Sequence, residues 1–256
     1  MLKHTHTLWL ALIACVAITL GNIYWGWSLL WFLPVVIVWI GLTSWGVFDI
    51  RLGYFSKTWY KGEATQNYVS ITFDDGPTPF TPKILELLEQ HQMKATFFCI
   101  GKQMEKHPEI LTSIIEKGHT VGNHSYSHVW NIPFFSPPKI EQEINHTDEI
   151  LAQLTGTKTN LYRPPYGITN PNVVKACINC KKLIIGWSVR SLDTVIHQEE
   201  KILQRIIPRV KPGAIILLHD TSEHTINVVE QLLLSLKRMN LQSIPVDHLL
   251  KREYNA

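Results

Sequence analysis

Charge is what the beginning of this sequence lacks. No Asp, Glu, Lys or Arg lies between Lys3 and Asp49, so positions 4–48, 45 residues in all, are uncharged apart from protonation of His4 and His6, and most are apolar. A single helix of that length would measure about 68 Å at 1.5 Å per residue, more than twice the roughly 30 Å hydrocarbon core of a bilayer. We therefore expect two membrane-spanning helices joined by a short turn.

We place the first of these helices at residues 8–23 and the second at residues 29–47, with Gly21-Asn22 and Gly26 marking the turn. Six tryptophans are spread through this segment, and several fall near the expected helix ends, where amphipathic rings sit at the membrane interface. The alternative is a cleaved signal peptide over residues 8–20. It fits less well, because no clean small-x-small cleavage site is followed by a polar mature start.

Disulfide bonds and an excess of one charge are also missing. Four cysteines form no evident disulfide framework: Cys15 is in the apolar segment, Cys99 ends a buried-looking strand, and Cys177 with Cys180 lacks the second Cys-x-x-Cys of a zinc site. Beyond the apolar segment, 23 Lys and Arg (24 less the one before it) oppose 21 Asp and Glu, so no basic stripe indicates a nucleic-acid partner. No protein partner is evident either.

The sequence does contain two clusters of metal-ligand residues, fifty positions apart. The stretch Thr-Phe-Asp-Asp-Gly-Pro holds Asp74 and Asp75, and His-Ser-Tyr-Ser-His holds His124 and His128. Two neutral imidazoles and one carboxylate suit Zn²⁺, Co²⁺ or Fe²⁺ and leave coordination positions open for water or substrate. If Asp75 is the third ligand, Asp74 is free to act as a general base, and the combination predicts a hydrolase.

Each cluster alone has an ordinary explanation. Asp-Asp-Gly-Pro after an apolar run is also a common strand-ending turn, and His-x-x-x-His arises by chance more often than as a ligand pair. Three further segments change that balance, because they follow in chain order and supply an arginine, a carboxylate and another histidine: Arg163-Pro164-Pro165-Tyr166-Gly167, the stretch 187–193, and Leu217-Leu218-His219-Asp220.

With these segments, the sequence resembles the polysaccharide deacetylases, the family with the NodB homology domain (carbohydrate esterase family 4), from roughly residue 68 to residue 244. The resemblance implies that Asp75, His124 and His128 bind one divalent metal ion, with zinc the first choice and cobalt or another divalent ion as alternatives. It also implies that Asp74 is the general base and that Arg163 orients it.

The same resemblance implies the remaining roles. The backbone N–H of Tyr166 helps to hold the oxyanion, Leu217 lines the pocket for the acetyl methyl group, and His219 is the general acid that protonates the leaving amine. The fourth motif departs from the family pattern. Asp193 matches the carboxylate that pairs with the catalytic histidine, but Thr194 replaces the usual tryptophan and an earlier acid is lost. We still expect activity, with an altered substrate pocket.

An acid catalyst has to keep its proton near neutral pH. A carboxylate beside His219 would raise the pKa of the imidazole and hold that proton in place. Asp220 follows His219 directly, but neighbours on a strand point to opposite faces. Asp220 is therefore the less suitable partner, and the family resemblance implies that Asp193 is that carboxylate.

Past residue 67 the chain alternates short apolar strands with amphipathic helices. We expect strands at 68–73, 95–100, 119–122, 183–187 and 214–218, and helices from residue 81 and at 108–117, 138–154, 199–209 and 225–239. This alternation is typical of an α/β protein with a parallel sheet, and the motifs follow the carboxyl ends of strands, where a βα-barrel builds its active site. The family resemblance adds the shape, a distorted (β/α) barrel with seven strands.

We thus expect two transmembrane helices at 1–48, a polar membrane-proximal linker at 49–67 and a catalytic domain at 68–256. The expected protein is an integral membrane enzyme of the bacterial cell envelope that uses a metal to remove N-acetyl groups from N-acetylglucosamine-containing polysaccharide. The alternatives are an O-acetyl glycan esterase with the same site and an inactive membrane-tethered glycan-binding protein. The hairpin places the N-terminus and the catalytic domain on one side of the membrane. Flanking basic residues favour the cytoplasmic side, and the family favours the other.

Overall fold

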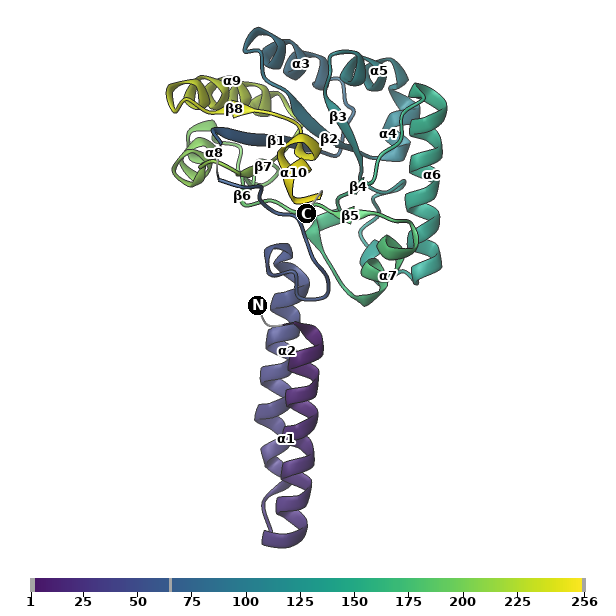
Figure 1. The fold of residues 1–256 in the computed structure, drawn as a ribbon, viewed down its shortest axis with the longest axis vertical. Helices are drawn as coiled ribbons and strands as arrows, with labels where there is room; N and C mark the ends of the chain where they lie inside the picture. The colour runs from purple at the N-terminus through teal and green to yellow at the C-terminus, as the bar shows by residue number, and fades with distance from the viewer. Residues whose placement is uncertain (1–2, 65, 255–256) are drawn as a thin grey trace.

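An elongated stalk of two helices carries a rounded head in the computed structural model, which describes residues 3–64 and 66–254 (Figure 1). The stalk consists of α1 (His4–Trp25), a 3-10 turn (Leu29–Trp31) and α2 (Phe32–Phe48). Its two spans, His4–Trp25 and Leu29–Phe48, have mean hydropathies of 1.8 and 1.9 and are long and apolar enough to cross a membrane. Only 17% and 6% of them is buried, which distinguishes them from the core helix of a soluble protein.

The turn of this hairpin lies later in the chain than the sequence predicts. Gly26 adopts the left-handed conformation, with φ of 68°, and ends α1, whereas Gly21 and Asn22 lie inside the helix. The prediction of a turn at Gly21-Asn22 is therefore wrong. The small residue serves packing instead, because a Cβ on Gly21 would come within 2.3 Å of the Trp27 ring.

The head is built on a curled parallel sheet, which confirms the distorted-barrel prediction. Seven strands pair in the order β5-β4-β3-β2-β1-β7-β6, and β8 pairs with the first half of β1. The strands are β1 (Tyr68–Asp74), β2 (Ala95–Cys99), β3 (Thr120–Asn123), β4 (Leu161–Tyr162), β5 (Leu183–Ile184), β6 (Val189–Arg190), β7 (Ile215–His219) and β8 (Gln242–Ser243).

Part of the segment expected to be a polar linker packs into the head. Trp59 forms a parallel bridge with Ile185, donating its N–H to Ile184 O and accepting from Gly186 N–H. The bridge lies just beyond β5, which is shorter than the predicted 183–187. Trp59 and Ile50 are both buried in one of the two hydrophobic clusters of the head. The head therefore depends on residues that precede β1.

Helices surround the sheet, and the sequence predicts most but not all of them. Three were missed: α4 (Gly101–Lys106), α7 (Pro171–Asn179) and α10 (Val246–Tyr254). The predicted helix 199–209 is α8 only to Ile206, and it continues as a 3-10 turn (Ile207–Arg209) that contains Pro208. The other predicted helices are α3 (Thr81–Gln90), α5 (Pro108–Glu116), α6 (Pro137–Thr155) and α9 (Glu223–Arg238) (Figure 1).

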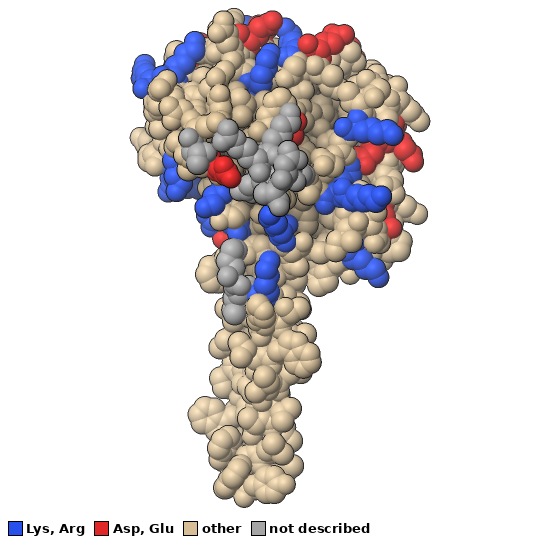
Figure 2. Space-filling model, viewed as in Figure 1, with Lys and Arg blue, Asp and Glu red and all other residues tan. Residues whose placement is uncertain are grey.

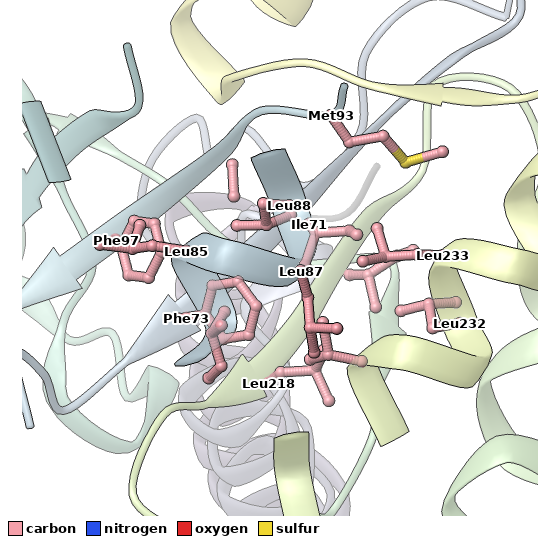
Figure 3. Packing of buried hydrophobic residues seen from close by; sticks show 14 of the residues in the cluster. Ile71, Phe73, Leu85, Leu87, Leu88, Met93, Phe97, Leu218, Leu232 and Leu233 are labelled. Atoms are coloured by element: carbon pink, nitrogen blue, oxygen red, sulfur yellow. The ribbon is translucent and has the colours of Figure 1, made fainter. Parts of the chain in front are cut away.

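The alternation of side chains along the strands separates the two clusters. Ile71, Phe73 and Leu218 point outward from the barrel into the larger cluster beneath α3 and α9, where Leu85, Leu88, Leu232 and Leu233 meet them (Figure 3). The rings of Phe73 and Phe97 stack there with centroids 5.0 Å apart. Residues one position along each strand face the other way. Asp74 at the end of β1 and His219 at the end of β7 are therefore on the interior side, directly opposite each other in the strand register.

Candidate metal centre and active site

Three of the predicted ligands converge at the carboxyl ends of β1 and β3. Asp75 Oδ1 lies 3.4 Å from His124 Nε2 and 3.5 Å from His128 Nε2, and the three ligand atoms all fall within 4.8 Å of one another. Asp75 Oδ1 is buried and has no hydrogen-bond donor among the described residues. An acceptor buried without a donor is costly, and a cation at this point would satisfy it.

The imidazoles present the atoms that a metal needs. His124 Nδ1 lies 2.7 Å from the carbonyl oxygen of Arg163, which can only accept, so Nδ1 carries the proton and Nε2 offers its lone pair to the centre. Burial and the neighbouring His124 lower the pKa of His128 to about 4, which keeps this ring neutral. Burial opposes but Asp74 and Asp75 raise the pKa of His124, so a cation there would displace a proton. The donor set fits a divalent ion of the zinc type.

Four residues in or beside the ligand cluster have a strained backbone. Asp75, Ser125, His128 and Tyr166 all have positive φ, at 74°, 66°, 49° and 61°, which non-glycine residues rarely adopt. Such conformations persist only where surrounding contacts hold them, and they cluster at functional sites. These φ values are therefore consistent with a functional site at this edge of the sheet.

Two polar side chains hold the histidine loop, and sequence reasoning missed both. Asn123, the last residue of β3, accepts the Ser125 N–H through Oδ1 at 2.9 Å. Glu143 on α6 accepts the N–H groups of Tyr126 and Ser127 at 3.1 and 2.7 Å, and the Ser127 hydroxyl as well. Asn123 precedes the histidine cluster directly and could have been suspected, whereas Glu143 lies in an ordinary amphipathic helix that carries no local signal.

Arg163 holds Asp74 from inside the barrel. Its Nη1 donates to Asp74 Oδ1 at 2.7 Å and to Thr72 Oγ1 at 2.8 Å, and its Nη2 donates to Gly186 O at 3.0 Å. The guanidinium is fully buried, with its Cζ 4.0 Å from the centre of the Phe98 ring. Burial lowers the pKa of Arg163 while Asp74 opposes that shift, and an arginine stays charged in this situation. One oxygen of Asp74 is thereby occupied, and the other, Oδ2, lies 3.8 Å from His124 Nε2.

His219 is paired with Asp193, the contact that the sequence predicts. Its Nδ1 lies 2.8 Å from Asp193 Oδ1, and its backbone N–H donates to Asp193 Oδ2 at 2.7 Å. Burial would lower the pKa of His219, but the hydrogen bond and charge of Asp193 outweigh it and raise that pKa to about 9. The Ser191 hydroxyl also donates to Asp193 Oδ1, at 2.6 Å.

Asp220 is fully buried and bonds to the hydroxyl of Thr81, away from His219, as the strand alternation predicts. Burial raises the pKa of Asp220 to about 7.

The predicted substrate residues border the same centre. The Tyr166 ring lies 4.9 Å from the ring of His128, and 47% of this tyrosine is exposed. Leu217 is buried on the interior face of β7. Thr194, where the family has a tryptophan, is exposed. Trp187 instead contributes an indole nearby, since a Cβ on Gly167 would lie 2.3 Å from its ring.

Comparisons with known proteins identify the family and the fold. The family model for polysaccharide deacetylase matches residues 61–181. A peptidoglycan-N-acetylglucosamine deacetylase from Bacillus cereus is 39% identical over 163 residues, covering 63% of this chain and 59% of that protein, so the chain spans less than two thirds of this relative. The peptidoglycan-N-acetylmuramic acid deacetylase PdaA of Bacillus subtilis is 29% identical, over 75% of this chain and 74% of that protein. The solved Bc1960 peptidoglycan N-acetylglucosamine deacetylase superposes with a TM-score of 0.71 at 32% identity, over 76% of this chain and 92% of that structure.

Proposed function

Because this chain belongs to the polysaccharide deacetylase family, we propose that it is a metal-dependent hydrolase that removes N-acetyl groups from N-acetylglucosamine-containing polysaccharide of the cell envelope. The bond cleaved is a carbon–nitrogen bond outside a peptide. The observation that carries the proposal is that two ion pairs and one ligand cluster converge at one edge of the sheet. The pairs are Asp74 with Arg163 and His219 with Asp193, and the cluster is the three-ligand set.

Asp75, His124 and His128 would hold the metal, with zinc the ion best matched to two imidazoles and one carboxylate. When bound, such an ion supplies Lewis-acid polarisation of the acetyl carbonyl and a more acidic water. The unpartnered Asp75 Oδ1 and the proton held at His124 Nδ1 support this assignment, because both are features of a site prepared for a cation.

Asp74 is proposed as the general base. Arg163 holds its Oδ1 and fixes the plane of the carboxylate, so Oδ2 is the oxygen left to accept a proton from the attacking water. Arg163 touches no solvent and acts only by positioning Asp74. Together they place the free oxygen of Asp74 beside the ligand cluster, where a general base would be needed.

His219 is proposed as the general acid on the other side of the scissile bond. Asp193 holds the proton at His219 Nδ1, and the raised pKa keeps the ring cationic at neutral pH. The proton at Nε2 can then pass to the leaving amine. The N–H of Tyr166 would stabilise the oxyanion, and Leu217 would contact the acetyl methyl group.

Acetate release tests the proposal. The full-length chain is incubated with N-acetylated chito-oligosaccharide, peptidoglycan and acetylated xylan, after chelation and again after Zn²⁺ or Co²⁺ is restored. Release from the N-acetyl substrates that depends on added metal is the expected result. Release from xylan alone would identify an O-acetyl esterase, and no release from any substrate would identify an inactive glycan-binding protein.

We further propose that residues 1–48 anchor the enzyme in the membrane, followed by the linker at 49–67 and the catalytic domain at 68–256. The two apolar spans support an anchor. The flanking basic residues and the family's envelope substrates point to opposite faces of the membrane. Protease digestion of intact cells, compared with digestion of lysed cells, decides the face, because only an outward-facing domain is cleaved in intact cells.

A further inference from the structure

A second pocket lies where the stalk meets the head. It has a volume of about 400 Å³ and is lined by the end of α2, the residues that follow it, β6 with the residues before it, and α8 with the turn after it. Four of its side chains are arginines, Arg51, Arg190, Arg205 and Arg209, and the one acid among its lining residues is Asp49. The composition of this wall indicates an anionic ligand.

The carboxylate of Asp49 already has a partner in the pocket. Asp49 takes two hydrogen bonds from Arg51, at 2.7 Å from Nε and 2.6 Å from Nη2. Arg190, Arg205 and Arg209 make no ion pair with a carboxylate within the described part of the chain. Arg209 Nη1 donates to Arg205 O at 2.6 Å, and Arg205 Nε is buried with no partner among the described atoms. A buried charged donor without an acceptor is costly, so an anion in this pocket would satisfy Arg205 Nε and neutralise the arginines that line it.

The position of the pocket restricts which anion reaches it. Trp45 and Phe48 at the end of α2 line it and are 59% and 70% exposed. Figure 2 shows the stalk free of charged side chains, with Lys and Arg gathered on the head where the stalk begins. If the stalk spans a membrane, aromatic rings at its end lie at the level of the lipid headgroups. The arginines then face the same layer.

We propose that this pocket binds the phosphate headgroup of an anionic membrane lipid. Planar guanidinium groups bind phosphate oxygens in pairs, and Trp45 and Phe48 would flank the glycerol and upper acyl chains. The proposal rests on membrane insertion of the hairpin and is independent of the deacetylase reaction.

A lipid held here would act on the position of the active site. Trp187 lines the pocket, and its ring centre lies 5.7 Å from Arg163 Cζ on the other side. The loop that carries Tyr166 is also tied to the stalk, because Thr169 N–H donates to Val47 O at 3.2 Å. A bound headgroup would therefore hold the catalytic edge of the barrel at a constant height and tilt above the bilayer.

Native mass spectrometry of the full-length chain tests the site. The detergent-solubilised protein is titrated with phosphatidylglycerol and with phosphatidylcholine. The wild-type chain should retain one phosphatidylglycerol selectively, and the Arg205→Gln, Arg209→Gln double variant should bind it roughly tenfold more weakly or worse. Arg238→Gln, which removes an exposed arginine at the far end of α9, is the matched control and should bind as wild type does.

The other outcomes are assigned in advance. Equal retention of the two lipids by the wild-type chain, or undiminished phosphatidylglycerol binding by the folded double variant, overturns the proposal. Inorganic phosphate that displaces the lipid at equal concentration would identify a site for free phosphate. A wild-type chain that does not float with phosphatidylcholine liposomes also overturns it, because the pocket would then not face a bilayer. If circular dichroism shows the double variant unfolded, the exposed Arg209→Gln alone replaces it.

Discussion

Arg163 determines how the neighbouring carboxylate can act. It is the largest fully buried side chain of the head, and the partners of its donors are Asp74, Thr72 and the carbonyls of Ile185 and Gly186. A buried charge of this kind persists because its donors are satisfied. Arg163 occupies one oxygen of Asp74 and leaves the other open, so in the proposed reaction this carboxylate would act through one defined atom.

Replacing Asp74 by Asn should separate the base from the metal. The side chain keeps its size and loses its basicity, so the variant should retain its metal while kcat falls by roughly 10² or more. The change also leaves Arg163 without its counter-charge, at a cost of about 3–5 kcal/mol in unfolding free energy. Metal content, Tm and kcat are therefore measured on one sample. Activity within a few-fold of wild type would give Asp74 another role.

His128→Ala should remove most of the bound metal and nearly all activity. The loss of one of three protein ligands lowers the affinity for a divalent ion and leaves a gap beside Asp75 and His124. Elemental analysis of the purified protein measures the amount of bound metal, and His248→Ala on the exposed side of α10 is the control. Unchanged metal content in the His128 variant would rule out the assigned ligand set.

The pH dependence should report the His219–Asp193 pair. A general acid whose pKa is raised to about 9 is protonated below that pH, so the rate should hold through neutrality and fall as pH rises through about 9. In Asp193→Asn the counter-charge is lost, and the alkaline limb should move down toward the ordinary histidine value of about 6.5. The profile of kcat/KM against pH measures both.

A second substrate supplies the control for this pair. His219→Ala should impair cleavage of an N-acetyl amide more than cleavage of an O-acetyl ester, because the amine is the poorer leaving group. Equal losses on both substrates, with a stationary alkaline limb, would mean that His219 positions the substrate and does not protonate it.

At the scale of whole elements, helix α6 acts as a clamp on the histidine loop. Glu143 accepts two backbone N–H groups of the loop between His124 and His128, and Asn123 accepts a third at its start. The positive φ values of Ser125 and His128 are maintained by these bonds. The backbone leading to His128, a proposed metal ligand, is thus held by a side chain of a neighbouring helix.

Glu143→Ala should therefore weaken metal binding by roughly 10- to 100-fold without removing a ligand. The measurement is the Kd for Zn²⁺ by competition with a chromophoric chelator. Glu141→Ala is the matched control, since Glu141 is on the same helix but bonds to Asn179 instead. Equal affinities in the two variants would show that the loop holds its shape without α6.

The molecule as a whole is a catalytic head on an apolar hairpin, joined by a segment that belongs partly to the head. Tyr54 packs against Gly46 and bonds to Thr7 in the stalk, whereas Trp59 pairs with the sheet and is buried in its core. The residues near 54 are therefore held by contacts with the stalk, and those near 59 are held by contacts with the barrel.

Two truncations should locate the boundary. Deletion of residues 1–48 should give a soluble, folded, metal-binding head, because Ile50 and Trp59 remain. Deletion of residues 1–67 removes both from the core, and a buried Trp alone is worth about 3–5 kcal/mol, so Tm should fall by roughly 10 °C or more. Thermal melting of both proteins measures the difference. Aggregation and metal loss in the shorter deletion would show that the hairpin itself is part of the fold.

Much of the fold and the metal-ligand cluster could be predicted from short stretches of the sequence. Apolar length without charge predicted the hairpin, the alternation of strands with helices predicted a parallel sheet, and ligand types at the strand ends predicted Asp75, His124 and His128 as one cluster. Each of these signals lies in a short window of the chain, where side-chain type and period act directly. The barrel shape came from the family resemblance. The Asp193–His219 contact was predicted as well, but from the family resemblance; strand alternation only made Asp220 the less suitable partner.

Contacts between residues far apart in the sequence could be identified only from the tertiary structure. Four contacts join residues from separate elements. Trp59 pairs with Ile185 beside β5, Glu143 holds the histidine loop, Gly21 packs on Trp27, and four arginines line one pocket at the base of the head. No local period marks such residues, because each is an ordinary member of its own helix or loop. Their roles arise from the register and packing of the whole chain, which place the partners together only after the sheet has formed.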